Sequence, residues 1–191
     1  MATAAHRLTA EEAIRRHAES GEHRDEFVAG RLLPVSPAGA LHGLVIAEVA
    51  RRLGNQMREH GGGRIFADAG FVLGLPEDPE RVPSPDVAFV SHEAIAAAGG
   101  VADERFLRAV PELAVEIFSP THDREPEQFH QRVRDLLDAG VRILWVIYPA
   151  ARYAVVHHRD GSARMLRDDD ELEGEDALPG LRIRMGDLLD G

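Results

Sequence analysis

The chain has 191 residues, of which 44% are hydrophobic, and a net charge of -11 at pH 7. This length predicts a single domain, residues 1–191, with a substantial hydrophobic core. No apolar run is long enough for a transmembrane helix, no signal-peptide segment is found, and the absence of cysteine excludes disulfides and thiolate metal sites. We therefore expect a cytoplasmic protein with no membrane partner.

The net charge is negative, and the basic residues are of an unusual composition. All 22 basic residues are arginines, and none is lysine. A protein that holds DNA through its phosphates normally has a basic patch, so the net acidity argues against strong non-specific DNA binding. Much of the acidity lies in the run Asp168 to Asp176, which we expect to form a solvated loop.

The first elements in the chain are a helix and a hairpin. Thr9 and Glu12 form a T-x-x-E capping box, which predicts a helix over about residues 9–19. The core is expected over about residues 22–185 and begins with two short strands that meet at Ala29-Gly30.

A long amphipathic helix is predicted from about His42 to His60, and the run Gly61-Gly62-Gly63 ends it. A strand is expected over residues 64–75, bent near Gly70. The buried face of the helix is predicted from its apolar spacing to comprise Leu44, Ile46, Val49, Ala50 and Leu53.

The second half of the chain predicts alternating strands and helices. Residues 92–110 are expected to hold one or two short helices, and the C-terminal residues a loop and one short element. Asp160-Gly161 is a favourable hairpin turn. The pattern predicts a mixed α/β fold with a β-sheet flanked by helices and a βαβ crossover. The predicted segments are strands 87–90, 113–118 and 142–147, helix 126–139, and hairpin strands 153–158 and 162–166.

Two carboxylates stand in otherwise apolar strands. Asp86 begins the strand of PSPDVAFV, and Glu116 lies within PELAVEIFSP. Burial of a carboxylate without a partner is costly, so the pair indicates a shared counter-charge. A hard cation such as Mg²⁺ is bound by oxygen ligands, and the backbone carbonyl of Ile117 is available as a third. The open alternatives are a turn cap for Asp86 and an arginine partner for Glu116.

The order of four segments resembles a known family. EFVAGRLLPVSPAGALHG, PSPDVAFVS, PELAVEIFSPTHD and DAGVRILWVIYP occur in the same order in Uma-type restriction-endonuclease-like proteins, of the PD-(D/E)xK nuclease superfamily. The resemblance implies a restriction-endonuclease-like core, a nuclease activity dependent on Mg²⁺ or Mn²⁺, and a homodimer acting on nucleic acid, expected to be DNA. It assigns metal binding to Asp86 and Glu116, beside the Ile117 carbonyl named above as a third ligand, and a supporting catalytic role to Glu26.

The chain departs from this family at the basic position. The superfamily lysine two residues after Glu116 would fall on Phe118, and the position to which this family moves it is Arg132. The resemblance therefore assigns the catalytic cation to Arg132. Gln128 and Gln131, on the same predicted helix, are candidates for a further polar contact. Leu136 stands where the family pattern has an aromatic residue. Tyr148 stands where an Asp-Pro pair is usual.

Two functions follow from this departure. Arginine holds a phosphate well but does not readily release its proton, so it is not equivalent to lysine. If the lysine only stabilises charge, Arg132 sustains catalysis by a metal-dependent nuclease. If the lysine must deprotonate or position water, the chain is a catalytically degenerate nuclease fold that acts as a dimeric binding or regulatory module. For Arg132 itself, an ordinary salt bridge is the alternative role.

Overall fold

The computed structural model describes most of the chain. The described residues are 8–12, 15–16, 25–28, 31–34, 39–102, 106–119 and 126–190, with the backbone alone for the two short segments 25–28 and 31–34. Among their helices, none is both long and apolar enough to cross a membrane.

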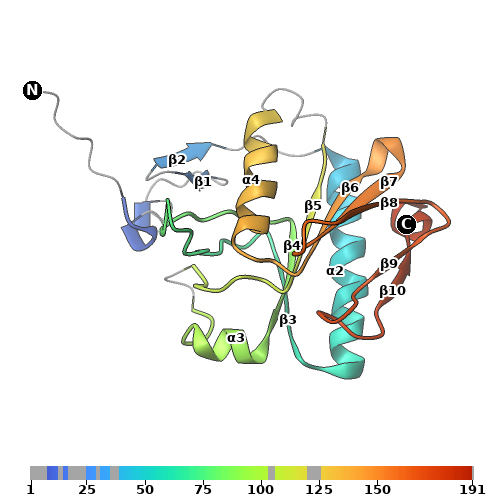
Figure 1. The fold of residues 1–191 in the computed structure, drawn as a ribbon, viewed down its shortest axis with the longest axis horizontal. Helices are drawn as coiled ribbons and strands as arrows, with labels where there is room; N and C mark the ends of the chain where they lie inside the picture. The colour runs from blue at the N-terminus through green and yellow to red at the C-terminus, as the bar shows by residue number, and fades with distance from the viewer. Residues whose placement is uncertain are drawn as a thin grey trace, which may run out of the picture.

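A six-stranded mixed sheet forms the centre of the molecule (Figure 1). Its strand order is β3-β4-β5-β6-β7-β8, and neighbouring strands are antiparallel except for the parallel pair β5 and β6. The strands are β3 (Gly63–Ala67), β4 (Val87–Ser91), β5 (Leu113–Ile117), β6 (Ile143–Tyr148), β7 (Tyr153–His158) and β8 (Ala163–Arg167). The predicted mixed α/β fold is confirmed.

The parallel pair is connected by helix α4 (Pro126–Asp138), as the predicted βαβ unit requires. Gly140 ends this connection with φ of 93°, a left-handed conformation that glycine adopts without a steric penalty. The short 3-10 helix η2 (Pro149–Ala151) joins β6 to β7. Gly161, with φ of 86°, forms the turn between β7 and β8 at the predicted position.

Helices lie on both faces of the sheet, and α2 (Ala40–His60) and α4 occupy opposite faces (Figure 1). The predicted buried face of α2 is partly wrong, because Leu44 is 68% exposed. The buried stripe instead consists of His42, Val45, Val49 and Leu53, while Ile46 and Ala50 pack at its margin. Gly61 ends the helix as expected, and its N–H donates to the carbonyl of Met57.

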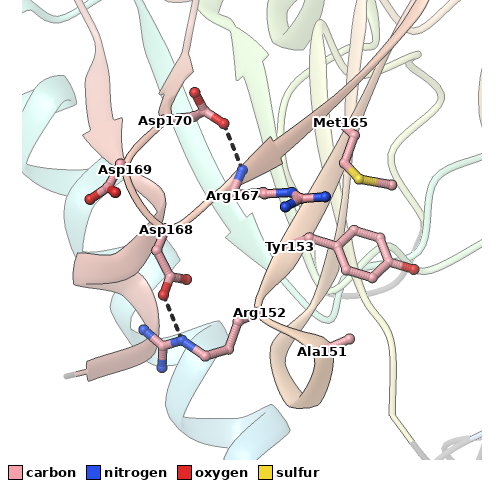
Figure 2. Close-up of a pocket in the computed structure, with 8 residues that line it drawn as sticks. All are labelled: Ala151, Arg152, Tyr153, Met165, Arg167, Asp168, Asp169 and Asp170. Carbon is pink, nitrogen blue, oxygen red and sulfur yellow. Dashed lines mark hydrogen bonds and ion pairs between the residues drawn. The ribbon is translucent and has the colours of Figure 1, made fainter.

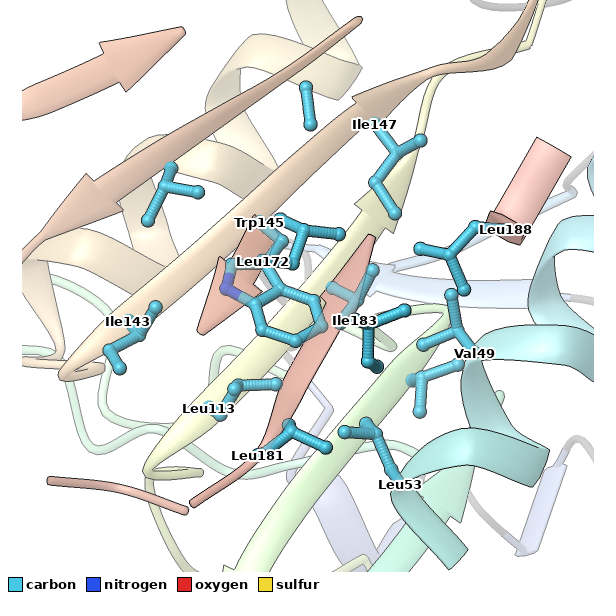
Figure 3. Close-up of a cluster of buried hydrophobic side chains, with 14 of the residues drawn as sticks. Val49, Leu53, Leu113, Ile143, Trp145, Ile147, Leu172, Leu181, Ile183 and Leu188 are labelled. Carbon is cyan, nitrogen blue, oxygen red and sulfur yellow. The ribbon is translucent and has the colours of Figure 1, made fainter. Parts of the chain in front are cut away.

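The core on the α2 face also includes the C-terminal elements, namely β9 (Glu171–Glu173), β10 (Arg182–Arg184) and α5 (Met185–Asp190) (Figure 3). Trp145 lies at its centre and is fully buried. Among the described residues, its indole N–H has no hydrogen-bond partner, so the ring contributes through packing.

The core on the opposite face is covered by α4 and by α3 (His92–Ala97), the one regular helix within the described part of residues 92–110. Ser91 caps α3 by accepting a hydrogen bond from the Ala94 N–H. Phe129 and Leu136 of α4 pack against this sheet face.

The strand predicted over residues 64–75 is much shorter in the structure. It ends at Ala67 because Asp68 has φ of 52°, a left-handed conformation that leaves the strand. Beyond that point the chain pairs with loops: the Phe71 N–H donates to Pro83, and Phe71 forms an isolated parallel bridge with Leu107.

The acidic run Asp168–Asp176 is also not the predicted loop, because β9 lies within it. Leu172 points into the core and is fully buried, whereas the flanking Glu171 and Glu173 form ion pairs with Arg182 on β10. Acidic, apolar and acidic side chains alternate here, which is the pattern of a half-buried strand. The surrounding run of charges hid this pattern in the sequence.

At the N-terminus, the capping box is confirmed. The Thr9 N–H donates to Glu12 Oε2 at 2.8 Å, and the Glu12 N–H donates to Thr9 Oγ1 at 3.2 Å. Part of the predicted helix 9–19 lies outside the described residues. The hairpin is observed as antiparallel β1 (Asp25–Val28) and β2 (Arg31–Pro34), and its predicted turn, Ala29-Gly30, lies outside them too.

Candidate active site

The antiparallel register of β4 and β5 brings the two singled-out carboxylates together. Val87 lies opposite Val115, so the next step of the same register sets Asp86 opposite Glu116. Residues directly opposite each other in such a pair have their Cβ atoms about 5 Å apart. The sheet thus places Asp86 and Glu116 side by side at one end of two central strands.

Asp86 is held by contacts to both of its carboxylate oxygens. Oδ2 accepts a hydrogen bond from the Ile117 N–H at 2.7 Å, and Oδ1 lies 3.1 Å from His42 Nε2. His42 stands in the first turn of α2, where the helix dipole favours a negative charge. Asp86 is therefore fixed beside the residue that follows Glu116.

Glu116 is completely buried and forms an ion pair with Arg132. The Arg132 Nε lies 2.9 Å from each carboxylate oxygen, and the guanidinium carbon stands 5.8 Å from the centre of the Phe129 ring. Arg132 is itself only 8% exposed. The arginine of α4 thus provides the counter-charge that a buried carboxylate on β5 needs.

A second buried ion pair lies one helical turn further along α4. Arg81 is in the loop that leads to Asp86, and its Nε donates to Asp135 Oδ2 at 2.5 Å. Gln131 donates to the other oxygen, Asp135 Oδ1, at 2.7 Å. This network fastens the helix of Arg132 to the loop of Asp86. Sequence reasoning missed Asp135, although its i+3 spacing from Arg132 places both on one helix face.

The other predicted site residues are placed less completely. Glu26 lies in β1 opposite Leu33, and the position of its side chain lies outside the described part of the structure. Ile117 is the last residue of β5, next to Glu116. Gln131 contacts Asp135 rather than a carboxylate of the pair, and Gln128 is exposed.

The chemistry of the donors is suited to a hard divalent cation. Asp86 and Glu116 offer carboxylate oxygens, and the Ile117 carbonyl offers a third oxygen at the same end of β5. Across the described ranges, no group of three or more His, Asp or Glu side chains is placed to hold a metal. A cation here would therefore rely on two carboxylates, a carbonyl, water and substrate, which is the arrangement that Mg²⁺ commonly accepts.

These features define a class of protein: a restriction-endonuclease-like α/β fold, with two acidic residues at the ends of adjacent central strands. The sequence model of the Uma2 family, described as "Putative restriction endonuclease", matches residues 10–186. The chain belongs to this family, and the resemblance stated from the sequence motifs is confirmed.

A solved structure has the same fold. It is the crystal structure of a "putative nuclease belonging to DUF820" from Anabaena variabilis, which superposes with a TM-score of 0.76 over 96% of this chain and 98% of that one. The two sequences are 16% identical, so the likeness concerns the fold. Among curated proteins, no sequence matches this chain.

Proposed function

We propose that this protein is a divalent-metal-dependent nuclease that hydrolyses phosphodiester bonds in DNA. The observation that carries the proposal is the placement of Asp86 against the Ile117 N–H, opposite Glu116 on the neighbouring strand. Membership of a family described as a putative restriction endonuclease supports it.

In this proposal, Asp86, Glu116 and the Ile117 carbonyl hold Mg²⁺ or Mn²⁺. A bound divalent cation polarises a phosphate and lowers the pKa of water. The contact between His42 and Asp86 orients the carboxylate, since its distance of 3.1 Å allows a hydrogen bond. Glu26 contributes a further carboxylate from the first hairpin.

Arg132 provides the positive charge that lysine supplies elsewhere in the superfamily. Its guanidinium already lies beside Glu116, so it is near the place where negative charge develops on the phosphate. Five N–H donors allow it to hold Glu116 and a phosphate oxygen together. Because arginine keeps its proton, Arg132 stabilises charge and leaves proton removal from water to another group.

Cleavage assays test the proposal. Plasmid and single-stranded DNA are incubated with the protein and Mg²⁺ or Mn²⁺, beside the variants Asp86→Ala and Glu116→Ala. The expected result is metal-dependent cleavage that both substitutions abolish. Cleavage that persists in both variants would show that these carboxylates are not the site.

A second candidate function is a catalytically degenerate fold that acts as a binding or regulatory module. The observation in its favour is that Arg132 engages both oxygens of Glu116 in a fully buried pair. Calorimetric titration with Mn²⁺ separates the two functions. Carboxylate-dependent binding supports the nuclease, whereas absence of binding at millimolar Mn²⁺ supports the degenerate fold.

We further propose that the chain is a single domain that works in the cytoplasm as a homodimer on nucleic acid. The basis for the dimer is that nucleases of this kind often cut as dimers. Light scattering gives the molecular mass in solution, and a mass of two chains is expected. A purely monomeric protein that still cleaves DNA would exclude the dimer.

A further inference from the structure

In the part of the chain that the structure describes, no helix lies over the β7–β8 end of the sheet face on which α4 packs (Figure 1). Tyr148 of β6 packs in the core under α4, and the strand register sets Tyr153 opposite Tyr148, with Arg167 opposite Tyr153. Met165 lies two residues before Arg167 and so shares this face. Met165 is 54% exposed and Arg167 is exposed, whereas the alternate residue Leu166 is buried on the other face.

A row of aromatic rings leads from the candidate active site to this open face. Phe129, beside Arg132, contacts Phe118 edge to face with centroids 5.2 Å apart. Phe118 contacts Tyr148 at 5.1 Å, and Tyr148 stacks on Tyr153 at 4.6 Å with an interplanar angle of 18°. The row therefore runs from Phe129 through Phe118, which lies two residues after Glu116, to Tyr153.

A pocket of about 770 Å³ lies at the end of the row, and it is lined by Tyr153, Met165 and Arg167 together with Ala151, Arg152 and the three aspartates 168–170 (Figure 2). In Figure 2, Tyr153, Met165 and Arg167 project to the same side of the β7–β8 hairpin, while Arg152 and Asp168 extend to the other. Tyr153, Met165 and Arg167 are named the stacking face here. It combines an aromatic ring, a flexible apolar side chain and a cation.

One cation of the stacking face is open to the phosphate of a ligand. Of the neighbouring acids, Asp168 pairs with Arg152 at 2.8 Å and Asp169 pairs with Arg184, while Asp170 accepts a hydrogen bond from the backbone N–H of Arg167. Within the described ranges, no ion pair involves the Arg167 guanidinium. Arg167 thus remains available to an outside anion.

We propose that the stacking face binds an unpaired nucleobase, with its phosphate at Arg167, and that single-stranded DNA is the form bound beside the active site. The inference rests on the proposed nuclease function and names its substrate class. Every base has a flat π-face that stacks on an aromatic ring, and a cation next to the ring holds the backbone. Bases within a duplex are covered by their neighbours, so only an unpaired base reaches Tyr153.

Binding without metal tests the inference independently of cleavage. Fluorescence anisotropy is measured in EDTA with a labelled single-stranded oligonucleotide and with the duplex of the same sequence. Single strands are expected to bind more tightly. Tyr153→Leu should weaken binding about tenfold, the scale of one lost base stack, while Tyr153→Phe keeps the ring and the affinity.

Arg167 has a matched control on its own strand. Arg164 is exposed and lies opposite Val156, on the other face of β8. Arg167→Ala should lower the slope of log affinity against log salt by about 0.7, as expected for one lost phosphate contact on a single strand. Arg164→Ala should leave the slope unchanged.

Photo-crosslinking with an oligonucleotide that contains 5-iodouracil locates the contact, and Tyr153 is the expected site.

Equal affinity for duplex and single strand, or no effect of Tyr153→Leu, would overturn the inference. A change of oligomeric state on Tyr153→Leu without a change in binding would make this face an interface between copies instead. Metal-dependent cleavage that is lost in Asp86→Ala but unaffected by Tyr153→Leu would overturn this inference alone. Absence of cleavage with intact Tyr153-dependent binding would overturn only the nuclease function.

Discussion

The Nε atom of Arg132, a residue that is 8% exposed, lies 2.9 Å from both carboxylate oxygens of the fully buried Glu116. The arginine is thus the counter-charge of the carboxylate that a divalent cation would use. The same contact compensates the buried charge of Glu116 and competes with the metal for its oxygens. The first two predictions follow from this competition.

Removal of the guanidinium should destabilise the protein strongly unless a metal replaces it. Arg132→Met leaves a buried carboxylate without a counter-charge, so the free energy of unfolding should fall by about 3–5 kcal/mol. Mn²⁺ should restore part of this loss. Urea unfolding with and without Mn²⁺ measures both effects, and Arg134→Met, an exposed position of the same helix, is the control. No response of Arg132→Met to Mn²⁺ would argue against a metal at Glu116.

Lysine in place of Arg132 should increase the rate of DNA cleavage. An ammonium group holds Glu116 through a single point charge and is able to release its proton, which arginine does not. The expected gain is up to about 100-fold, the lower end of what a general acid or base contributes. Single-turnover cleavage by Arg132→Lys measures it, and Arg134→Lys controls for surface charge. Slower cleavage by Arg132→Lys would indicate that the planar guanidinium group, with its several N–H donors, is itself required.

The Arg81–Asp135 pair should be important for stability through its buried contact. Each single substitution, Arg81→Met or Asp135→Leu, leaves one buried charge without its partner. Each should lower the free energy of unfolding by about 3–5 kcal/mol. The double variant should lose much less than the sum, because neither charge then remains. A double-mutant cycle of unfolding free energies measures the coupling. Additive losses would show that the two side chains do not stabilise each other.

We expect the protein to lose stability at mildly acidic pH because of His157. Burial lowers the pKa of His157 below its ordinary value of 6.5, and the neighbouring His158 lowers it further. The unfolded chain then takes up the proton at a higher pH than the folded one, so stability falls as pH drops through 6.5 towards the folded-state pKa. Unfolding of His157→Gln should show a weaker pH dependence in this range. Parallel curves for the two proteins would contradict the assignment.

Two glycines should respond oppositely to alanine. A Cβ at Gly63 would lie 2.3 Å from the backbone oxygen of Val90, so Gly63→Ala should destabilise β3 by about 1–3 kcal/mol. Gly54 lies within α2 and has no atom within 4 Å of the added Cβ. Gly54→Ala should therefore stabilise by about 0.5–1 kcal/mol. Thermal unfolding of both variants checks the signs.

The sequence predicted the sheet core well where a strand was apolar throughout. Strands β4, β5 and β6 and the helix between the last two follow from runs of buried residues and from Gly140. Predictions failed where tertiary contacts decide the conformation. Leu44 fits the helical spacing but faces outward, and β9 is held by Leu172 against the core despite its acidic neighbours.

The candidate site was predictable in its acids but not in its connections. Asp86 and Glu116 stood out because carboxylates are rare in apolar strands. Their partners depend on register and helix packing, so neither the bond from Ile117 to Asp86 nor the link from Arg81 to Asp135 was visible in the sequence. The aromatic row had no sequence signal either, because its members come from helix α4, strands β6 and β7, and the residue that follows β5.

Whether Asp86 and Glu116 share a divalent cation is visible in an anomalous difference map from a crystal soaked in Mn²⁺. We expect a peak between the two carboxylates, at metal–oxygen distances of about 2.1–2.2 Å, and a Glu116 that has turned at least one oxygen from Arg132 to the metal. Manganese found only elsewhere, with the Arg132–Glu116 pair intact, would contradict a shared cation.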